Sequence, residues 1–375
     1  MTIDNEFHIA VLAGDGIGLE IMPPCLTLLD MLQDQVGGFA LRYEALDAGA
    51  ACYARSGTAL PDETVKHAEA ADAILLGAMG LPDIRYPDGR EIAPQIDLRE
   101  IFELFAGVRP IKTFPGLPMP LADPRAQTLD FVMIRESTEG LFAGRGKTRM
   151  HGDDRAEDTM VITRAASERL FDFAFDLARA RKAAGAPGKV TCVDKANVFG
   201  SFAFFRRIFD ERAAAYPDIA TDHCYVDATA LSLIRDPWQF DVMVTENMFG
   251  DILSDAGAAL MGGMGLAPSA DIGLERAVFQ PSHGTAPDIM GTGKANPVAM
   301  LRSAAMMLDW LGTRHGVDTC QAAGARLEAA VALAFADGAL RPYEMGGTSG
   351  LKEITDAVTA ALSGGGRERQ AATGT

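Results

Sequence analysis

The sequence predicts an α/β fold in which a parallel or mixed β-sheet is flanked by helices. Strand-like segments alternate with helix-like segments along most of the 375 residues, and this alternation is typical of α/β proteins. The strand-like segments are continuous apolar runs, such as AILL at residues 73–76, which are typical of strands buried on both faces. The length is sufficient for two domains of ordinary size.

The first third of the chain contains three predicted strands and two predicted helices. HIAVLAGDGIG (8–18) is an apolar run that leads into a glycine turn, and residues 18–33 then follow with helical periodicity despite two adjacent prolines. ADAILLGAMG (71–80) repeats the pattern of a strand before a glycine turn. DLREIFELFAG (97–107) predicts a helix that stops at glycine, and VRPIKTF (108–114) predicts the next strand.

The rest of the chain continues the alternation. TLDFVMIRES (128–137) is strand-like up to its polar end, and residues 167–185 form a strongly amphipathic helical pattern. The segment 189–199 indicates a strand and a turn, and 240–263 indicates a strand, a turn and a helix. Residues 295–312 and 320–338 are predicted helices. No repeat of 20 to 50 residues is present, which argues against a solenoid or propeller.

Composition excludes several classes of function. The formal net charge of −17 repels phosphate backbones and anionic lipid, so we expect neither nucleic acid nor membrane as a partner. The longest apolar stretches are too short to span a bilayer, and the N-terminal residues MTIDNEF lack the pattern of a secretory signal. The five cysteines are widely spaced and form no zinc-binding pattern, which favours reduced thiols in a cytoplasmic protein.

Two acids, Asp251 and Asp255, lie four residues apart in the predicted helix of 240–263. This spacing places both carboxylates on one helical face, where they repel one another unless a cation lies between them. Oxygen ligands of this kind suit Mg²⁺ or Mn²⁺. A solvated or helix-capping acid pair has the same spacing, so the pattern alone leaves both interpretations open.

Basic residues stand at the ends of several predicted elements. Arg99, Arg109 and Arg135 lie at a helix beginning, a strand beginning and a strand end, and arginine binds carboxylates through two parallel hydrogen bonds. Lys195 follows an apolar strand beside Asp194, where partial burial would make it a usable base. Surface ion pairs and a snorkelling lysine are the structural alternatives.

HGTAPDIMGTGKANP (283–297) is rich in glycine and proline and lies between two regular elements. Such a loop lets the backbone approach a ligand closely. Neither this segment nor GDGIG (14–18), whose glycines are evenly spaced, matches a phosphate-binding loop or the G-x-G-x-x-G dinucleotide fingerprint.

Together these motifs identify a protein family far more specifically than any single motif does. In its motifs the chain resembles the β-decarboxylating dehydrogenases, which act on isopropylmalate, isocitrate, homoisocitrate, tartrate or D-malate, and it is most similar to the 3-isopropylmalate enzymes. The resemblance covers nearly the whole chain, with the motifs in the family's order: AVLAGDGIGLEI, DLREIFELFAGVRP, FVMIRESTEG, VDKANVF, YVDATAL, NMFGDILSDAGAALMGGMGLAPSA and HGTAPDIMGTGKANP.

The resemblance implies a role for each matching residue. Arg99, Arg109 and Arg135 match arginines that hold the substrate's carboxylates, and Asp227, Asp251 and Asp255 match the carboxylates around a Mg²⁺ or Mn²⁺ ion. Lys195 matches the presumed base, which acts together with Asp227. In the family these two residues enter the active site of the partner subunit, so the resemblance implies a homodimer with shared active sites. The segment 141–163 resembles the arm through which the subunits contact one another.

The resemblance also implies the cofactor. The loop residues expected to contact it are His283, Gly284, Thr285, Ala286, Asp288 and Asn296. Asp288 matches the acid that receives the ribose hydroxyls of NAD, where NADP enzymes of the family carry a basic residue. We therefore expect NAD.

The implied fold has two domains built on a mixed sheet flanked by helices. Residues 1–105 and 262–375 would form a discontinuous cofactor-binding domain, and residues 106–261 would form a metal-binding and dimerisation domain. The implied reaction is oxidation of a small (2R)-malate-type dicarboxylate, with decarboxylation. Tartrate, D-malate or isocitrate oxidation, oxidation without decarboxylation, and a non-catalytic regulatory subunit are the alternatives.

Two positions depart from the family pattern. Phe142 stands where the family has a tyrosine whose phenol helps to protonate the enolate, so the decarboxylation half of the reaction is in question. The residues that would contact the substrate's C3 substituent are Ile92, Ala93, Gln95 and Ile96. They match neither the isopropylmalate nor the isocitrate pattern. Gln95 favours a polar substituent, whereas the isoleucines favour an alkyl one.

Overall fold

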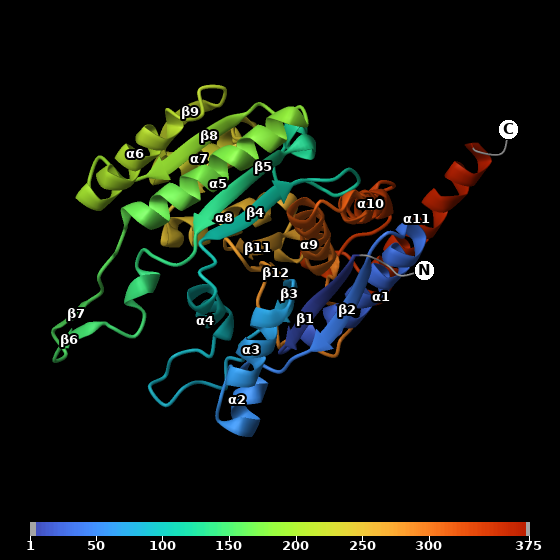
Figure 1. The fold of residues 1–375 in the computed structure, drawn as a ribbon, viewed down its shortest axis with the longest axis horizontal. Helices are drawn as coiled ribbons and strands as arrows, with labels where there is room; N and C mark the ends of the chain where they lie inside the picture. The colour runs from blue at the N-terminus through green and yellow to red at the C-terminus, as the bar shows by residue number, and fades with distance from the viewer. Residues whose placement is uncertain (1–4, 373–375) are drawn as a thin grey trace.

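A mixed β-sheet flanked by helices confirms the predicted α/β class. The computed structural model describes residues 5–372, and side chains as far as residue 364. Within these residues a ten-stranded sheet runs in the order β2-β1-β3-β12-β11-β4-β5-β10-β8-β9, and Figure 1 shows it extending through the length of the molecule. No helix of the described part is long and apolar enough to cross a membrane.

The N-terminal elements place three parallel strands side by side. They are β1 (Glu6–Gly14), α1 (Gly18–Val36), β2 (Ala40–Ala45), α2 (Ala50–Ser56), α3 (Asp62–Ala70), β3 (Ala73–Ala78) and α4 (Pro94–Ile101). The expected strands at 8–18 and 71–80 are thus confirmed. The predicted helix of 97–107 is wrong at both ends, because α4 begins at Pro94 and the chain leaves the helix at Glu103, whose φ is +48°.

The middle of the chain forms the other end of the sheet. Its elements are β4 (Ala106–Lys112), β5 (Asp130–Glu136), β6 (Arg149–His151), β7 (Arg155–Glu157), α5 (Arg164–Ala183), β8 (Lys189–Asp194), α6 (Gly200–Ala213), β9 (Ala220–Tyr225), α7 (Val226–Arg235), β10 (Val242–Thr245) and α8 (Asn247–Met261). The strands and helices expected at 108–114, 128–137, 167–185, 189–199 and 240–263 are all present.

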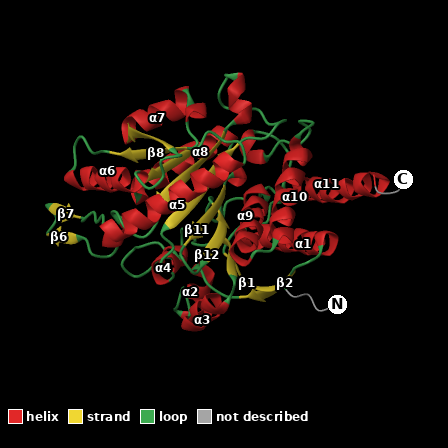
Figure 2. Ribbon diagram, turned by 45° about the horizontal axis from the view of Figure 1, so that its top comes forward, coloured by secondary structure: helices red, strands yellow, loops and turns green. Residues whose placement is uncertain are grey.

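The C-terminal elements return to the first half of the sheet. They are β11 (Pro268–Ile272), β12 (Ala277–Pro281), α9 (Val298–His315), α10 (Asp318–Phe335) and α11 (Leu351–Ala372). Short 3-10 turns lie at 124–128, 142–144, 237–239, 264–266 and 343–345. In Figure 2 the helices α1, α9, α10 and α11 gather at one end of the molecule.

The two predicted domains correspond to the two halves of one sheet. Strands β2, β1, β3, β12 and β11 come from 1–105 and 262–375, and the other five come from 106–261. The halves meet where β11 pairs antiparallel with β4, which in turn pairs antiparallel with β5. The proposed domain boundaries therefore fall between two paired strands, and the division into domains stays a prediction.

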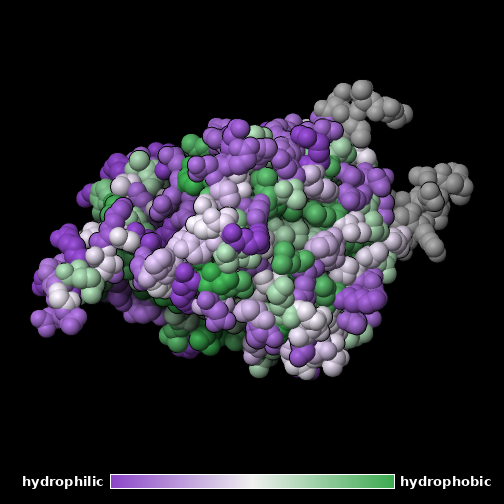
Figure 3. All heavy atoms as spheres, turned by 90° about the horizontal axis from the view of Figure 1, so that it is seen from below, coloured by the Kyte–Doolittle hydropathy of each residue, from purple (hydrophilic) through white to green (hydrophobic). Residues whose placement is uncertain are grey.

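An arm projects from the middle of the chain, within the expected segment 141–163. Strands β6 and β7 form an antiparallel hairpin, and Met150 at its centre is 66% exposed. The hairpin stands clear of the body in Figures 1 and 2. In Figure 3 its surface is mainly hydrophilic, like much of the face shown.

Candidate active site

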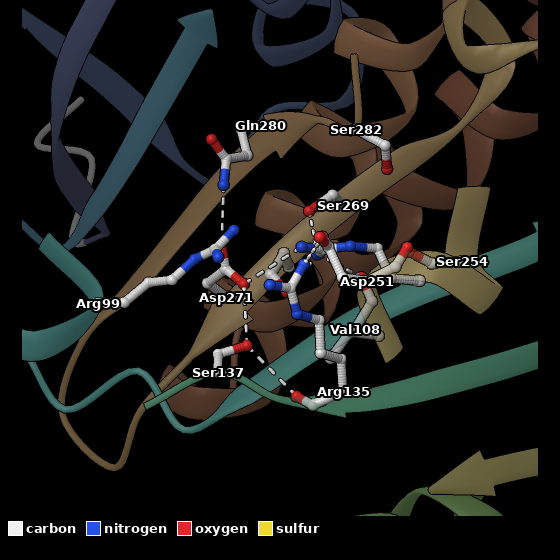
Figure 4. Close-up of polar contacts among 12 residues, drawn as sticks. Arg99, Val108, Arg135, Ser137, Asp251, Ser254, Ser269, Asp271, Gln280 and Ser282 are labelled. Carbon is white, nitrogen blue, oxygen red and sulfur yellow. Dashed lines mark hydrogen bonds and ion pairs between the residues drawn. The ribbon is translucent and has the colours of Figure 1, made fainter. Parts of the chain in front are cut away.

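A cavity of about 230 Å³ collects most of the predicted site residues on one face of the sheet. The side chains come from α4, β4, β5, α8 and the segment that follows β12. The predicted residues that line the cavity are Gln95, Arg99, Arg109, Arg135, Asp251, Asp255, His283 and Gly284. Figure 4 shows the central polar contacts.

The pairing of β4 with β5 explains why two of the arginines meet. Arg135 lies opposite Gly107, and Arg109 stands two residues further along the same strand, so both side chains leave the same face of the sheet. Gly107 is required here, because a Cβ atom would lie 2.6 Å from Ser137 Oγ. Arg99 enters from α4, and all three arginines are buried.

Asp271 on β11 holds two of these arginines in place, and sequence reasoning missed it. Its carboxylate is 3.1 Å from Arg99 Nε and 3.5 Å from Arg109 Nη2, and it accepts a hydrogen bond of 2.7 Å from Gln280 Nε2. Burial raises the pKa of Asp271, but the charges of the arginines outweigh this effect and leave the pKa below its ordinary value. The signal available in the sequence was a lone acid inside the apolar segment LAPSADIG.

Burial and mutual repulsion perturb the arginines of the cluster. Burial, followed by the charge of Arg99, lowers the pKa of Arg135 to about 10. Burial also lowers the pKa of Arg109. Because a buried cation without full compensation favours any anion that reaches it, the cluster is suited to binding a carboxylate.

Helix α8 presents the two predicted acids to the same cavity. Glu246 caps the helix by accepting hydrogen bonds from the backbone N–H groups of Met248 (3.1 Å) and Phe249 (2.7 Å). Asp251 pairs with Arg135. Burial, followed by the charge of Asp251, raises the pKa of Asp255. The acids thus repel one another at the edge of the arginine cluster, as their spacing predicts.

The N-terminal end of α8 also fixes Arg135. Asn247 is fully buried and accepts hydrogen bonds from Arg135 Nε (3.0 Å) and Nη2 (2.7 Å). At Gly250 a Cβ atom would lie 2.7 Å from the Arg135 side chain. The helix can therefore approach β5 closely enough for Asp251 to reach the guanidinium group.

Of the residues that depart from the family pattern, Gln95, Ile96 and Phe142 line the cavity, whereas Ile92 and Ala93 do not. Phe142 places its ring centroid 5.1 Å from the Arg135 guanidinium carbon. The Oε1 atom of Gln95 is buried and has no hydrogen-bond partner among the described residues. The cavity wall thus contains an aromatic ring without a hydroxyl group and an amide with unused hydrogen-bonding capacity.

Lys195 and Asp227 lie outside this cavity. Lys195 follows β8, Asp227 lies in the first turn of α7, and Lys195 Nζ is 2.6 Å from Asp227 Oδ1. The lysine, together with the backbone N–H groups of the helix start, lowers the pKa of Asp227. Among the described residues, no cluster of three or more His, Cys, Asp or Glu side chains is close enough to hold a metal ion. A single chain therefore brings only two of the three predicted metal ligands to the cavity.

The segment after β12 begins at the cavity and continues toward the N-terminal turn. Thr285 is buried, its Oγ1 donates to Gly80 O (2.6 Å), and its carbonyl accepts from Ile17 N–H (2.9 Å). Ala286 has a φ of +37°, and Asp288 is exposed. Asn296 donates to Glu344 (2.8 Å). Of the six predicted loop residues, His283 and Gly284 line the cavity, Thr285 and Asn296 are buried, and Asp288 is exposed.

Asp15 organises this region and was also missed. It is buried, and its carboxylate accepts hydrogen bonds from the backbone N–H groups of Ala50 (2.7 Å), Ala51 (2.9 Å) and Gly80 (2.9 Å). At Gly16 a Cβ atom would lie 2.2 Å from Thr285 O. The GDGIG turn thus needs small residues in order to pack against the loop after β12.

Comparison with known proteins gives the same assignment. The family model described as isocitrate/isopropylmalate dehydrogenase matches residues 8–358. The chain is 41% identical to the 3-isopropylmalate/3-methylmalate dehydrogenase of Methanocaldococcus jannaschii, over 90% of this chain and 96% of that protein. It is 40% identical to the 3-isopropylmalate dehydrogenase of Lactococcus lactis, over 93% and 97%.

A solved structure agrees as well. The isocitrate dehydrogenase of Methylococcus capsulatus superposes with a TM-score of 0.83 at 34% identity and covers 95% of this chain and 99% of that one. The family match spans both the arginine cluster and the acid pair. The chain therefore belongs to the isocitrate/isopropylmalate dehydrogenase family.

Proposed function

We propose that this chain oxidises the C2 hydroxyl of a (2R)-malate-type dicarboxylate with NAD and releases the C3 carboxyl group as CO₂. 3-Isopropylmalate is the first candidate substrate, because that name recurs among the relatives. The observation that carries the proposal is the convergence of three buried arginines and two carboxylates in one cavity. Two substrate carboxylates would meet the arginines, and the hydroxyl group would face the acids.

The acid pair fits a divalent cation. Burial, followed by the charge of Asp251, raises the pKa of Asp255, so a bound cation would stabilise both carboxylates. Asp227 lies elsewhere in the same chain. A second copy of the chain that supplies Asp227 would complete the oxygen ligands, which supports a homodimer with shared active sites.

Each residue of the site would have a separate role in the reaction. Arg99, Arg109 and Arg135 would fix the carboxylates, so that the C2 hydroxyl lies at a defined place. Lys195 from the second copy would accept the hydroxyl proton. A divalent cation at the acids would supply positive charge to the C2 oxygen, and NAD would accept the hydride. Phe142 lacks a hydroxyl group, so it cannot protonate the enolate that CO₂ loss leaves behind.

The preference for NAD rests on Asp288. This carboxylate is exposed on the loop after β12, where it would accept hydrogen bonds from ribose hydroxyls and repel a 2′-phosphate. At Gly284 a Cβ atom would meet no other atom within 4 Å, so a ligand could approach the backbone there. Equal kcat/KM values for NAD and NADP would contradict this assignment.

We propose a cytoplasmic location, which the free thiols support. All five cysteines are free, and four of them are buried, which suits a reducing compartment. Fractionation of cells that express the full chain would test the location.

Turnover of a substrate panel tests the proposed function. The purified protein would be assayed with Mn²⁺, NAD and each of 3-isopropylmalate, D-malate, tartrate and isocitrate, with NADH and CO₂ measured together. We expect equal amounts of NADH and CO₂ from 3-isopropylmalate, and loss of turnover with EDTA that returns when Mn²⁺ is restored. The variant Arg135→Gln should raise KM, whereas Arg125→Gln, a change in an exposed arginine, should not.

Other results of this assay would change the proposed reaction, substrate or metal site. NADH without CO₂ would limit the reaction to oxidation, as the phenylalanine at position 142 suggests. Preference for tartrate, D-malate or isocitrate would reassign the substrate. Lack of turnover with all four acids would favour a non-catalytic regulatory subunit, and turnover that is unaffected by EDTA would reject the metal site.

A further inference from the structure

A second cavity lies on the opposite face of the same strands. Its volume is about 560 Å³, compared with about 230 Å³ for the candidate active site. Alternation along β4 separates the two, because Val108 and Pro110 line the second cavity whereas Arg109 lines the first. The same holds for β12, where Phe279 faces the second cavity and Gln280 the first.

Helices from both halves of the sheet form the walls. Phe173, Leu177 and Ala180 of α5 line one side, and Met306 and Trp310 of α9 line the other. These residues are spaced three or four positions apart, so each helix turns one continuous stripe toward the cavity. Figure 1 shows α5 and α9 on the same side of the sheet. A ligand here would contact residues 106–261 and 262–375 at once.

All ionisable side chains in the lining are acids. They are Asp176, Asp309 and Glu328. Glu328 forms an ion pair with Arg302, whose Nε lies 3.1 Å from the carboxylate. Among the described residues, no hydrogen bond or ion pair involves the side chains of Asp176 or Asp309. Asp176 and Asp309 are both exposed. Arg179 pairs with Asp218. Arg314 pairs with Glu275 and lies over the Trp310 ring, with its guanidinium carbon 5.2 Å from the ring centroid.

The apolar surface beside these acids is partly aromatic. The rings of Phe279 and Trp310 lie with their centroids 5.9 Å apart, and Phe173 faces them from α5 across the cavity. Aromatic faces attract organic cations, and apolar walls bind the hydrocarbon part of such molecules. An anionic ligand would meet only carboxylates in this lining.

We propose that this cavity binds a small amphipathic organic cation, namely a protonated primary amine with an aromatic or alkyl body. The ammonium group would lie at the rim beside Asp309 and Asp176, and the body would cover Trp310 and the floor formed by β4 and β12. The site is independent of the proposed dehydrogenase activity, because none of these residues lines the candidate active site.

The test compares matched probes on the full-length protein. Phenethylammonium, phenethyl alcohol and 3-phenylpropionate share a phenyl ring but carry a positive, a neutral and a negative group. Binding would be measured by isothermal titration calorimetry and by quenching of tryptophan fluorescence. We expect saturable binding of the cation with a Kd about tenfold lower than that of the alcohol, and no binding of the anion.

Variants locate the site. The double variant Asp176→Asn/Asp309→Asn should weaken binding of the cation about tenfold and leave the alcohol unchanged. The control Asp34→Asn removes one carboxylate charge from an exposed position on α1 and should have no effect on the binding of the cation. Ala180→Leu should fill part of the cavity and weaken both ligands, and circular dichroism would verify that each variant is folded.

Three results would overturn the proposal. Equal affinity for phenethylammonium and phenethyl alcohol would remove the role of the acids. Undiminished binding to both the double variant and Ala180→Leu would place the ligand elsewhere. Absence of binding by all three probes, together with self-association that Ala180→Leu abolishes, would assign the surface to a second copy of the chain.

Discussion

Replacing Asp271 with alanine is expected to destabilise the protein and to disorder the substrate-binding arginines. Asp271 is 1% exposed, and it contacts Arg99, Arg109 and Gln280. The variant would leave two buried guanidinium groups without their nearest charge partner. Removing one member of a buried ion pair costs about 3–5 kcal/mol, and with two arginines affected we expect a loss within this range in the free energy of unfolding.

The assay is chemical denaturation followed by far-ultraviolet circular dichroism, with all proteins at equal concentration because self-association adds to apparent stability. Asp271→Asn keeps the side-chain volume but removes the charge, and should show most of the same loss. Asp356→Asn removes an acid from the exposed pair with Lys352 and should change stability far less. A loss below about 1 kcal/mol in Asp271→Ala would refute the reasoning.

The pH dependence provides a second check of the same prediction. The pKa of Asp271 in the folded protein lies below its ordinary value of 3.8, so its stabilising contribution is complete above 3.8 and is lost as the pH falls through the folded pKa. The stability difference between the wild type and Asp271→Asn should therefore be constant at neutral pH and decrease only in acid below 3.8. A difference that decreases between neutral and mildly acidic pH would show that another group is responsible.

Three further predictions concern the reaction. Lys195→Gln should lower kcat about 10²- to 10⁴-fold with little change in substrate Kd, whereas Lys189→Gln, at the start of the preceding strand β8, should not lower kcat. Steady-state kinetics would measure kcat and calorimetry would measure Kd. An unchanged kcat would remove Lys195 from the mechanism. Asp288→Lys should raise the NADP/NAD ratio of kcat/KM about tenfold or more, because it replaces a repelling charge with an attracting one; a ratio that does not move would reject the loop as the ribose site. Phe142→Tyr should raise kcat if protonation of the enolate limits turnover. The variant should release CO₂ and NADH in equal amounts. A lower kcat would show that this chain protonates the enolate by another route.

Local pattern determined the class of the fold and the shared helical face of the acid pair, whereas the roles of the site residues came from the family resemblance. Continuous apolar runs identified most of the central strands, and helical spacing placed Asp251 and Asp255 on one face of α8. These features depend on residues within a few positions of one another, so a single segment contains the information. The boundaries of α4 were missed because the helix end depends on the left-handed backbone of Glu103 and on where β4 enters the sheet.

The tertiary structure alone decided which charges meet. Asp271 reaches Arg99 from a strand 172 residues away in sequence, and Asp15 binds backbone groups at the start of α2 and in the loop after β3. The tertiary structure also keeps Lys195 and Asp227 away from the arginine cluster. It places a second cavity on the opposite face of the strands that carry the cluster. No periodicity encodes such contacts, because the energy of a buried charge depends on whichever groups the completed sheet brings next to it.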